Sequence, residues 1–470
     1  EMLASLSARA WARRWKRVST TRGGVVDMAV RPRVFSSGEQ PETMIDLLKG
    51  HPCPSHLPSQ KLSKALHRLS ARAEAGELLL GYTPTEGPRA FREALSTFIS
   101  NRCSGDEGAR DNTCRMDGLF ATGGVSHGLD LACAVFGGGA GNVVLVESPS
   151  YFLAFDIFRA HGLSVVPAPT DEKGICPEEL EDLINQLQME GRRVSMLYLV
   201  ATHSNPSSTT LSLGRRKALV DIAERYELKI LADEVYHLLD WSKSPSSSSS
   251  PVTTSLPSLS RRRRPSRMAV LDTRYATEET HEDDGKYAVP DEQKSVSEQT
   301  GAVLSVSAFT KILCPGMRLG WIEAAPSVIS MLSSHPYVQS GGGLTPLQAQ
   351  LATELLQSEE QDDHLDGLIR DYKSRADTLT AALLQYPELF ELDGGAKPTK
   401  KVEGGYFVWV KLLKCGLPAA ELRDMARREF KVDFLPGERC HPDPSRKQVG
   451  IVSLSITETS RFLTPPLSPC

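Results

Sequence analysis

Short apolar runs alternate with amphipathic segments of helical period along the middle of the sequence, and this alternation limits the possible folds more than any other feature. The apolar runs end in turn residues, as buried strands do, and cover residues 143–146, 164–166, 196–200 and 229–232. Helical patterns lie between them, at 177–187 and 213–226. Strands and helices in alternation form a parallel sheet that is covered on both faces. The sequence therefore predicts an α/β fold.

The later part of the chain predicts a second, smaller unit. Helical patterns at 347–356 and 365–384 precede a strand at 405–410, which indicates an α+β domain. The predicted organisation is a basic extension over 1–40, an N-terminal arm and small-domain segment over 41–85, a large domain over 86–345 and a C-terminal small domain over 346–470, which diverges or is truncated after 437.

The N-terminal extension is basic. Residues 2–36 hold Arg and Lys among Ser and Ala, with Asp27 as the one acid, and Leu6, Trp11 and Trp15 trace an apolar face. This composition is typical of an organellar transit peptide, so we expect a mitochondrial or other organelle matrix location. A disordered basic tail on a cytoplasmic protein is the alternative.

Residues 244–300 interrupt the large domain with low-complexity sequence. A serine run at 246–250, an arginine run at 261–264 and an acidic run at 278–284 contain little apolar sequence. We therefore expect a disordered surface insertion. The arginine run is interpreted as a solvated loop rather than a localisation signal or a phosphate-binding patch.

Charge, cysteine content and hydropathy exclude several classes of function. Lys and Arg number 54 and Asp and Glu 58, a net charge of −4, which does not favour nucleic acid as a partner. The nine cysteines include no CxxC pair or His/Cys cluster at metal-ligand spacing, so we expect no metal site. The apolar stretch 128–146 contains Asp130 and three glycines, so we expect no membrane span.

Polar residues follow four of the predicted strands. Tyr151 follows the strand at 143–146, Asn205 the strand at 196–200 and Asp233 the strand at 229–232, and Lys311 with Arg318 follows an apolar run at 302–306. Each alone is weak evidence, because an Asp after a strand usually caps a helix and a lone Lys is usually solvated. Ligands of parallel sheets bind at the carboxyl ends of the strands. These residues are therefore expected to share one site.

In this order, these clusters resemble the class I/II aminotransferases of the fold type I pyridoxal 5'-phosphate enzymes over residues 45–437. The resemblance implies a large domain with a mostly parallel sheet flanked by helices, plus a smaller α+β domain. It implies that Lys311 forms a Schiff base with the cofactor and carries the proton, that Asp233 holds the ring nitrogen, and that Tyr151 stacks on the ring. Asn205 and Tyr236 would bind the 3′-oxygen.

The same resemblance implies a phosphate site and a partner subunit. Residues 122–131 are a glycine turn that opens a helix, where free N–H groups attract an anion. The implied phosphate ligands are Gly124, Val125, Ser126, Thr310 and Arg318, the last as a guanidinium fork. Tyr82 would reach the phosphate of a neighbouring subunit, which implies a homodimer with shared active sites. Gly50 and Asn205 would contact the substrate.

Three positions depart from the family pattern. Ala308 and Val125 stand where the family has hydroxyl ligands to the phosphate. The strand at 450–457 lacks the Arg that binds the substrate α-carboxylate in the family, and Arg446 and Arg461 only flank it. Two alternative explanations of this difference are an erroneous C-terminal sequence and an altered amino-acid site.

The predicted function is transamination between an amino acid and a 2-oxo acid by a ping-pong mechanism, in a chain similar to the 2-aminoadipate, aromatic and branched-chain group. The alternatives are a degenerate cofactor-binding protein without turnover, and elimination or decarboxylation on the same fold.

Overall fold

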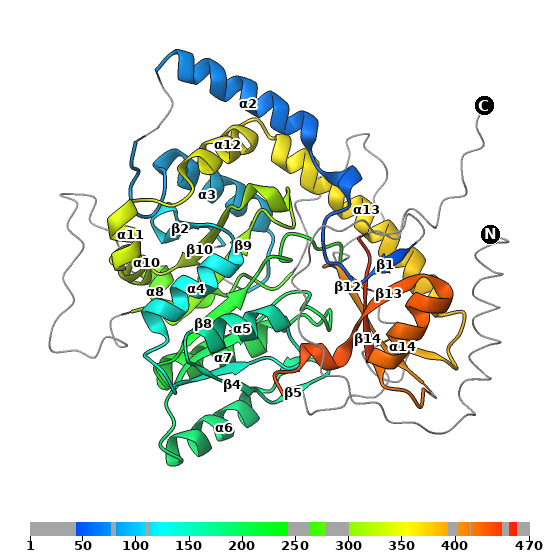
Figure 1. Ribbon diagram of the computed structural model, residues 1–470. Helices are drawn as coiled ribbons and strands as arrows, with labels where there is room; N and C mark the ends of the chain where they lie inside the picture. The colour runs from blue at the N-terminus through cyan, green and yellow to red at the C-terminus, as the bar shows by residue number, and fades with distance from the viewer. Residues whose placement is uncertain are drawn as a thin grey trace, which may run out of the picture.

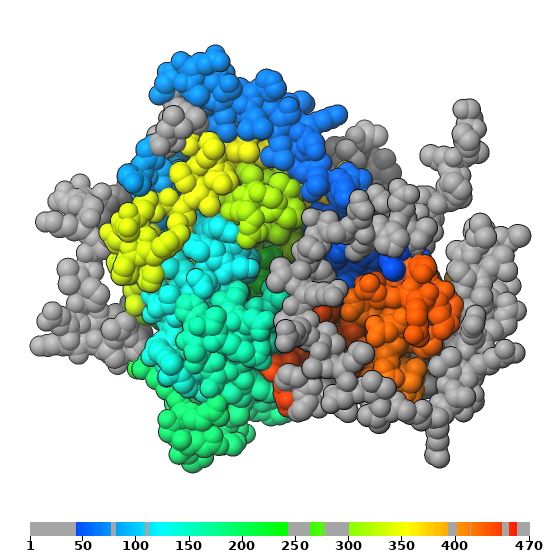
Figure 2. Space-filling model, viewed as in Figure 1, coloured from blue at the N-terminus to red at the C-terminus, as the bar shows by residue number. Residues whose placement is uncertain are grey.

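The computed structural model describes residues 44–76, 81–108, 112–242, 264–277, 300–392, 402–413, 415–443 and 451–457. They form two sheets with surrounding helices (Figure 1). In Figure 2 the smaller unit, in orange, lies beside the larger unit, in cyan and green. Among the helices of these residues, none has the length and apolar character needed to cross a bilayer.

The large unit is built on a seven-stranded sheet in the order β2-β10-β9-β8-β7-β3-β4. Only β10 runs antiparallel to its neighbours, so the predicted mostly parallel α/β sheet is confirmed. The strands are β2 (Leu119–Thr122), β3 (Val143–Val146), β4 (Ser164–Pro167), β7 (Val194–Leu199), β8 (Lys229–Asp233), β9 (Val303–Ala308) and β10 (Gly320–Ala324). A two-stranded ribbon of β5 (Thr170–Asp171) and β6 (Gly174–Ile175) lies outside this sheet.

Helices cover both faces of this sheet because successive strand side chains point to opposite sides. Val144 and Val146 pack in the core with α3, α4 and α5, whereas Val143 and Leu145 pack with α6 and α7. These helices are α3 (Arg89–Cys103), α4 (Val125–Phe136), α5 (Phe152–Ala160), α6 (Pro177–Met189) and α7 (Leu213–Arg225). The continuous apolar runs seen in the sequence therefore belong to strands buried on both faces.

The small unit is a five-stranded sheet in the order β1-β13-β14-β12-β11. Its first strand comes from the N-terminal arm and pairs in parallel with β13, so the two ends of the described chain meet here. The strands are β1 (Ile45–Leu47), β11 (Phe390–Leu392), β12 (Phe407–Leu412), β13 (Val432–Pro436) and β14 (Ile451–Ser455). The remaining helices are α2 (Ser59–Glu74), α8 (Thr273–Thr277), α10 (Pro326–Ser333), α11 (Pro336–Gly341), α12 (Pro346–Gln357), α13 (Glu360–Leu383) and α14 (Ala419–Met425).

The expectation of a disordered insertion is wrong for residues 264–277. Met268 and Ala269 are fully buried in the core of the large unit, and Arg264, the last member of the arginine run, is buried rather than solvated. The reason is charge pairing: Arg264 Nε lies 2.7 Å from Asp106 Oδ1, which makes burial of the cation possible. The serine run and the acidic run lie outside the described residues, as does the basic extension over 1–40.

Candidate active site

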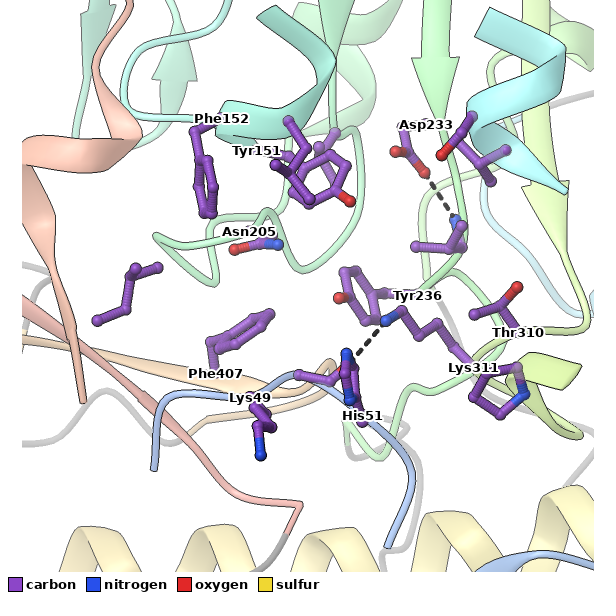
Figure 3. A pocket seen from close by; sticks show the side chains of 18 of the residues that line it. Lys49, His51, Tyr151, Phe152, Asn205, Asp233, Tyr236, Thr310, Lys311 and Phe407 are labelled. Carbon is purple, nitrogen blue, oxygen red and sulfur yellow. Dashed lines mark hydrogen bonds between the residues drawn. The ribbon is translucent and has the colours of Figure 1, made fainter. Parts of the chain in front are cut away.

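A cavity of about 340 Å³ lies where the large sheet, the small unit and the N-terminal arm meet (Figure 3). Ten of the residues predicted for the site line it: Gly50, Val125, Ser126, Tyr151, Asn205, Asp233, Tyr236, Thr310, Lys311 and Arg318. Gly124 lies beside this wall, where it contacts Arg318. Tyr82 does not line the cavity and is 90% exposed on the surface of this chain.

Asp233 is a buried and Lys311 a partly buried ionisable group, and both face this cavity. Lys311 follows β9, and its Nζ donates a hydrogen bond to the Gly50 carbonyl oxygen at 2.7 Å. Burial lowers the pKa of the Lys311 amine to about 8, although the Asp233 charge raises it. The amine is therefore partly neutral near physiological pH, as a nucleophile must be.

Asp233 ends β8, where its carboxylate accepts hydrogen bonds from the Tyr198 hydroxyl at 3.1 Å and from the Val235 backbone N–H at 3.4 Å. Burial raises the pKa of Asp233 to about 6 in spite of these bonds. No cationic side chain forms an ion pair with Asp233 within the described part of the chain. A buried carboxylate in this state is stabilised by a cationic ligand group.

The N-terminus of α4 and Arg318 form an anion cup. Gly124 precedes α4 with a φ of +100°, and no side chain caps the first turn, so its N–H groups are free for a ligand. The positive φ favours glycine at this position, and a Cβ there would lie 3.1 Å from Arg318 Nη2, so the guanidinium would have to shift by a few tenths of an ångström. Arg318 also donates to the Gly123 carbonyl oxygen at 3.1 Å.

Three polar side chains on the cavity wall make no hydrogen bond to any described residue: the Tyr151 and Tyr236 hydroxyls and the Asn205 amide. Burial raises the pKa of Tyr151 to about 12, so its hydroxyl is protonated at neutral pH. Unpaired polar groups inside a cavity indicate a binding site, because burying them without a partner is unfavourable. Together with the amine, the carboxylate and the anion cup, they fit an aromatic aldehyde that carries a ring nitrogen and a phosphate.

The family model for aminotransferase class I and II matches residues 42–452. The chain belongs to the class I and II aminotransferases. It is a pyridoxal 5'-phosphate-dependent aminotransferase of fold type I, and the residues described above match the needs of that cofactor.

Relatives of this aminotransferase carry related activities. Aromatic-amino-acid aminotransferase 1 of Thermococcus litoralis is 27% identical over 396 residues, which cover 84% of this chain and 79% of the relative. The crystal structure of a multiple substrate aminotransferase from Thermococcus profundus superposes with a TM-score of 0.67 at 26% identity, covering 89% and 87% of the two chains. An alpha-aminoadipate aminotransferase from Thermus thermophilus superposes with a TM-score of 0.64 at 25% identity, with 88% of each chain covered.

The departures noted in the sequence have a structural counterpart. Ala308 is fully buried at the end of β9 and offers no hydroxyl to the anion cup. On β14, Ser453 is fully buried, and its Oγ has no hydrogen-bond partner among the described residues. Arg446 and Arg461, which flank this strand in the sequence, lie outside the described ranges.

Other residues of the cavity wall were missed in the sequence. Phe152 and Leu153 line it together with Phe407, Leu435 and Arg439. Phe152 and Leu153 directly follow Tyr151, and this proximity was an available signal. Phe407, Leu435 and Arg439 come from the small unit, and no local pattern in the sequence places them beside Lys311. Leu48 and His51, which flank Gly50 in the segment expected to close over the substrate, also line the cavity.

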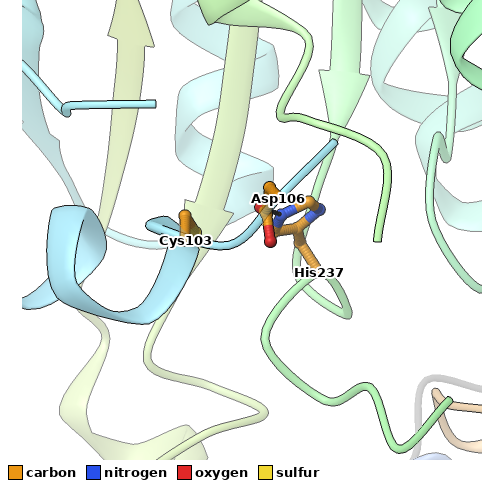
Figure 4. Close-up of side chains that lie close together, drawn as sticks. All are labelled: Cys103, Asp106 and His237. Carbon is orange, nitrogen blue, oxygen red and sulfur yellow. Dashed lines mark hydrogen bonds and ion pairs between the residues drawn. The ribbon is translucent and has the colours of Figure 1, made fainter. Parts of the chain in front are cut away.

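A buried ion-pair cluster lies outside the cavity, next in sequence to Tyr236 (Figure 4). His237 Nε2 lies 2.8 Å from Asp106 Oδ2, and Arg264 Nε lies 2.7 Å from the other carboxylate oxygen. Burial lowers the pKa of His237, but the Asp106 charge and the hydrogen bonds to Asp106 and Cys103 together outweigh it and raise the pKa to about 9. Cys103, Asp106 and His237 lie close enough to hold a metal ion. The carboxylate already balances two cationic side chains, so the cluster is a structural ion-pair network.

Proposed function

We propose that this aminotransferase transfers an amino group from an amino acid to a 2-oxo acid by a ping-pong mechanism, with Lys311 as the amine that links the cofactor and carries the proton. The observation that carries the proposal is the placement of Lys311 and the buried Asp233 in one cavity with the anion cup. The Lys311 pKa of about 8 supports both roles, because the amine can accept and return a proton near neutral pH.

The other residues position what Lys311 acts on. The bound cofactor supplies an electron-withdrawing ring, which makes the substrate Cα–H acidic. The Asp233 carboxylate would hold a proton on the ring nitrogen, and Arg318 with the first turn of α4 would hold the phosphate. Tyr236 and Asn205 would donate to the 3′-oxygen, and the Tyr151 ring would contact the ring of the cofactor. Lys311 Nζ would take the proton from the substrate Cα and return it during the transfer.

The test is the visible absorption spectrum of the purified holoenzyme before and after an amino acid is added without a 2-oxo acid. Transamination converts the bound cofactor to its pyridoxamine form and releases one equivalent of 2-oxo acid. Lys311→Ala abolishes the conversion, and the exposed Lys411→Ala is the matched control. Elimination or decarboxylation would instead yield ammonia or carbon dioxide in the product analysis. A spectrum that does not change with any amino acid would contradict the proposal.

We propose further that the enzyme is a homodimer with shared active sites and that residues 1–40 direct it to an organelle matrix. The exposure of Tyr82 on this chain supports the first statement, and the basic composition of the extension supports the second. A reporter fused to residues 1–40 is expected to enter mitochondria or another organelle. A reporter that stays in the cytosol would contradict the targeting role.

A further inference from the structure

The substrates of the proposed reaction all carry a carboxylate, so the cavity needs a cation that is free to bind it. Lys311 is committed to the cofactor and Arg318 to the anion cup. Lys49 Nζ lies 3.1 Å from Asp46 Oδ2, and Figure 3 shows the Lys49 side chain pointing away from the cavity. Burial and the Lys311 charge lower the pKa of His51, which disfavours the cationic form of its imidazole.

Arg439 is the remaining cationic side chain on the described cavity wall. It lies on the short 3-10 helix Gly437–Cys440, directly after β13, and it forms no ion pair or hydrogen bond with the described residues. Its guanidinium carbon lies 4.7 Å from the centre of the Phe152 ring. A guanidinium that lies over a ring is held in place by the ring face and keeps its N–H groups free for a carboxylate.

The position of Phe152 shows which side of the cavity Arg439 serves. Phe152 and Asn205 lie on the side of the cavity away from Lys311, and Phe407 lies on that side as well (Figure 3). An amino acid whose nitrogen reacts near Lys311 extends its other groups toward this side. Phe152 and Phe407 make this side largely apolar, and Leu153 and Leu435 also line the cavity. Apolar side chains do not bind a carboxylate, whereas a guanidinium such as that of Arg439 suits one.

No other cation replaces Arg439 from the adjacent strand. β14 presents Ser453 next to β13, with register partners Leu435 and Trp409. The Ser453 side chain is uncharged and does not line the cavity. Within the described residues, β14 therefore gives no positive charge to the substrate side of the site.

We propose that Arg439 binds the α-carboxylate of the amino-acid and 2-oxo-acid substrates and so determines which molecules this site accepts. The inference rests on the proposed transamination for the identity of the substrates. It assigns the carboxylate to a residue of the loop after β13 and leaves the apolar wall for the substrate side chain.

The first test measures binding and does not depend on turnover. Calorimetry of the holoenzyme compares 3-phenylpropionate with its neutral amide, 3-phenylpropionamide. We expect the wild type to bind the carboxylate about 10- to 100-fold more tightly, the range for hydrogen bonds to a charged group. Arg439→Met removes this preference and Arg439→Lys restores part of it. Arg428 is an exposed arginine of the same unit that does not line the cavity, so Arg428→Met keeps the preference for the carboxylate.

Two results would overturn the proposal. One is a wild type without preference for the carboxylate, and the other is an Arg439→Met variant that keeps the preference. If Arg446→Met or Arg461→Met loses the preference for the carboxylate while Arg439→Met keeps it, this is a case of the second result. Because neither ligand has an amino group, failure of transamination does not affect this measurement, and the two proposals fail separately.

Steady-state kinetics then identify the carboxylate. Binding of the α-carboxylate predicts that Arg439→Met raises KM by a similar factor for an aromatic amino acid, a branched-chain amino acid and 2-aminoadipate, while cofactor affinity is unchanged. A higher KM for 2-aminoadipate alone would assign Arg439 to a side-chain carboxylate and would overturn the α-carboxylate role.

Discussion

At the scale of single residues, the surroundings of Lys311 shift the pKa of its amine away from the value of a solvated lysine. A solvated lysine is almost fully protonated at pH 8, but burial lowers the pKa of Lys311 to about 8. The nearby Asp233 charge acts in the opposite direction and raises that pKa. Burial and the Asp233 charge together therefore leave part of the Lys311 amine neutral, and so nucleophilic, near physiological pH.

This balance predicts the pH dependence of cofactor capture by the apoenzyme. Only the neutral amine attacks an aldehyde, so the rate of cofactor incorporation should rise with pH and level off above about 8. Asp233→Asn removes the charge that raises the Lys311 pKa, so the midpoint should move to lower pH. Stopped-flow absorbance at several pH values measures both. A midpoint near the value of a solvated lysine would contradict this account.

At the scale of elements, the start of α4 depends on a conformation that only glycine adopts easily. Gly124 has a φ of +100° and lies against Arg318. Gly124→Ala should both strain the backbone by about 1–3 kcal/mol and displace the guanidinium, so that cofactor affinity falls. Gly139, with a φ of +108° and no neighbour near its Cβ position, is the matched control. Gly139→Ala should lower stability without changing cofactor affinity. Fluorescence titration measures the affinity of both variants, and equal affinities would contradict a role of Gly124 in the anion cup.

Residues 264–277 are a second element whose stability rests on charge. Arg264→Met leaves Asp106 with one buried partner and should lower the free energy of unfolding by about 3–5 kcal/mol. The exposed pair of Arg225 and Glu181 is the control, since Arg225→Met should leave stability nearly unchanged. Urea unfolding measures both. A stable Arg264→Met variant would show that packing of Met268 and Ala269 holds the segment without the ion pair.

The same network predicts how stability depends on pH. The pKa of His237 is raised to about 9 in the folded protein, above its unfolded value of about 6.5. Its stabilising contribution is therefore complete below pH 6.5 and is lost as the pH rises through 9. Urea unfolding at pH 7 and pH 9.5 should show a smaller decrease in stability for His237→Gln than for the wild type. An equal decrease in both proteins would contradict the assignment.

At the scale of the whole molecule, the proposed dimer makes each active site depend on two chains. Tyr82→Ala and Lys311→Ala homodimers should both be impaired, because every site in them carries the altered residue. In a mixed dimer of the two variants, one site holds both substitutions and the other holds neither. Mixed dimers should therefore regain about half of the wild-type activity per dimer, an expectation that follows from sharing a site across the interface. A monomer in sedimentation, or mixed dimers without recovery, would contradict shared sites.

The sequence by itself determined the α/β sheet and the group of residues at its strand ends. Strands such as Val143–Val146 are recognisable because burial on both faces leaves an unbroken apolar run, and parallel strands bring their carboxyl ends to one edge. Tertiary structure alone decided that Arg264 is buried and that Arg439 faces the cavity. Both depend on contacts with residues far away in the chain, Asp106 and Phe152, and no local pattern records such contacts.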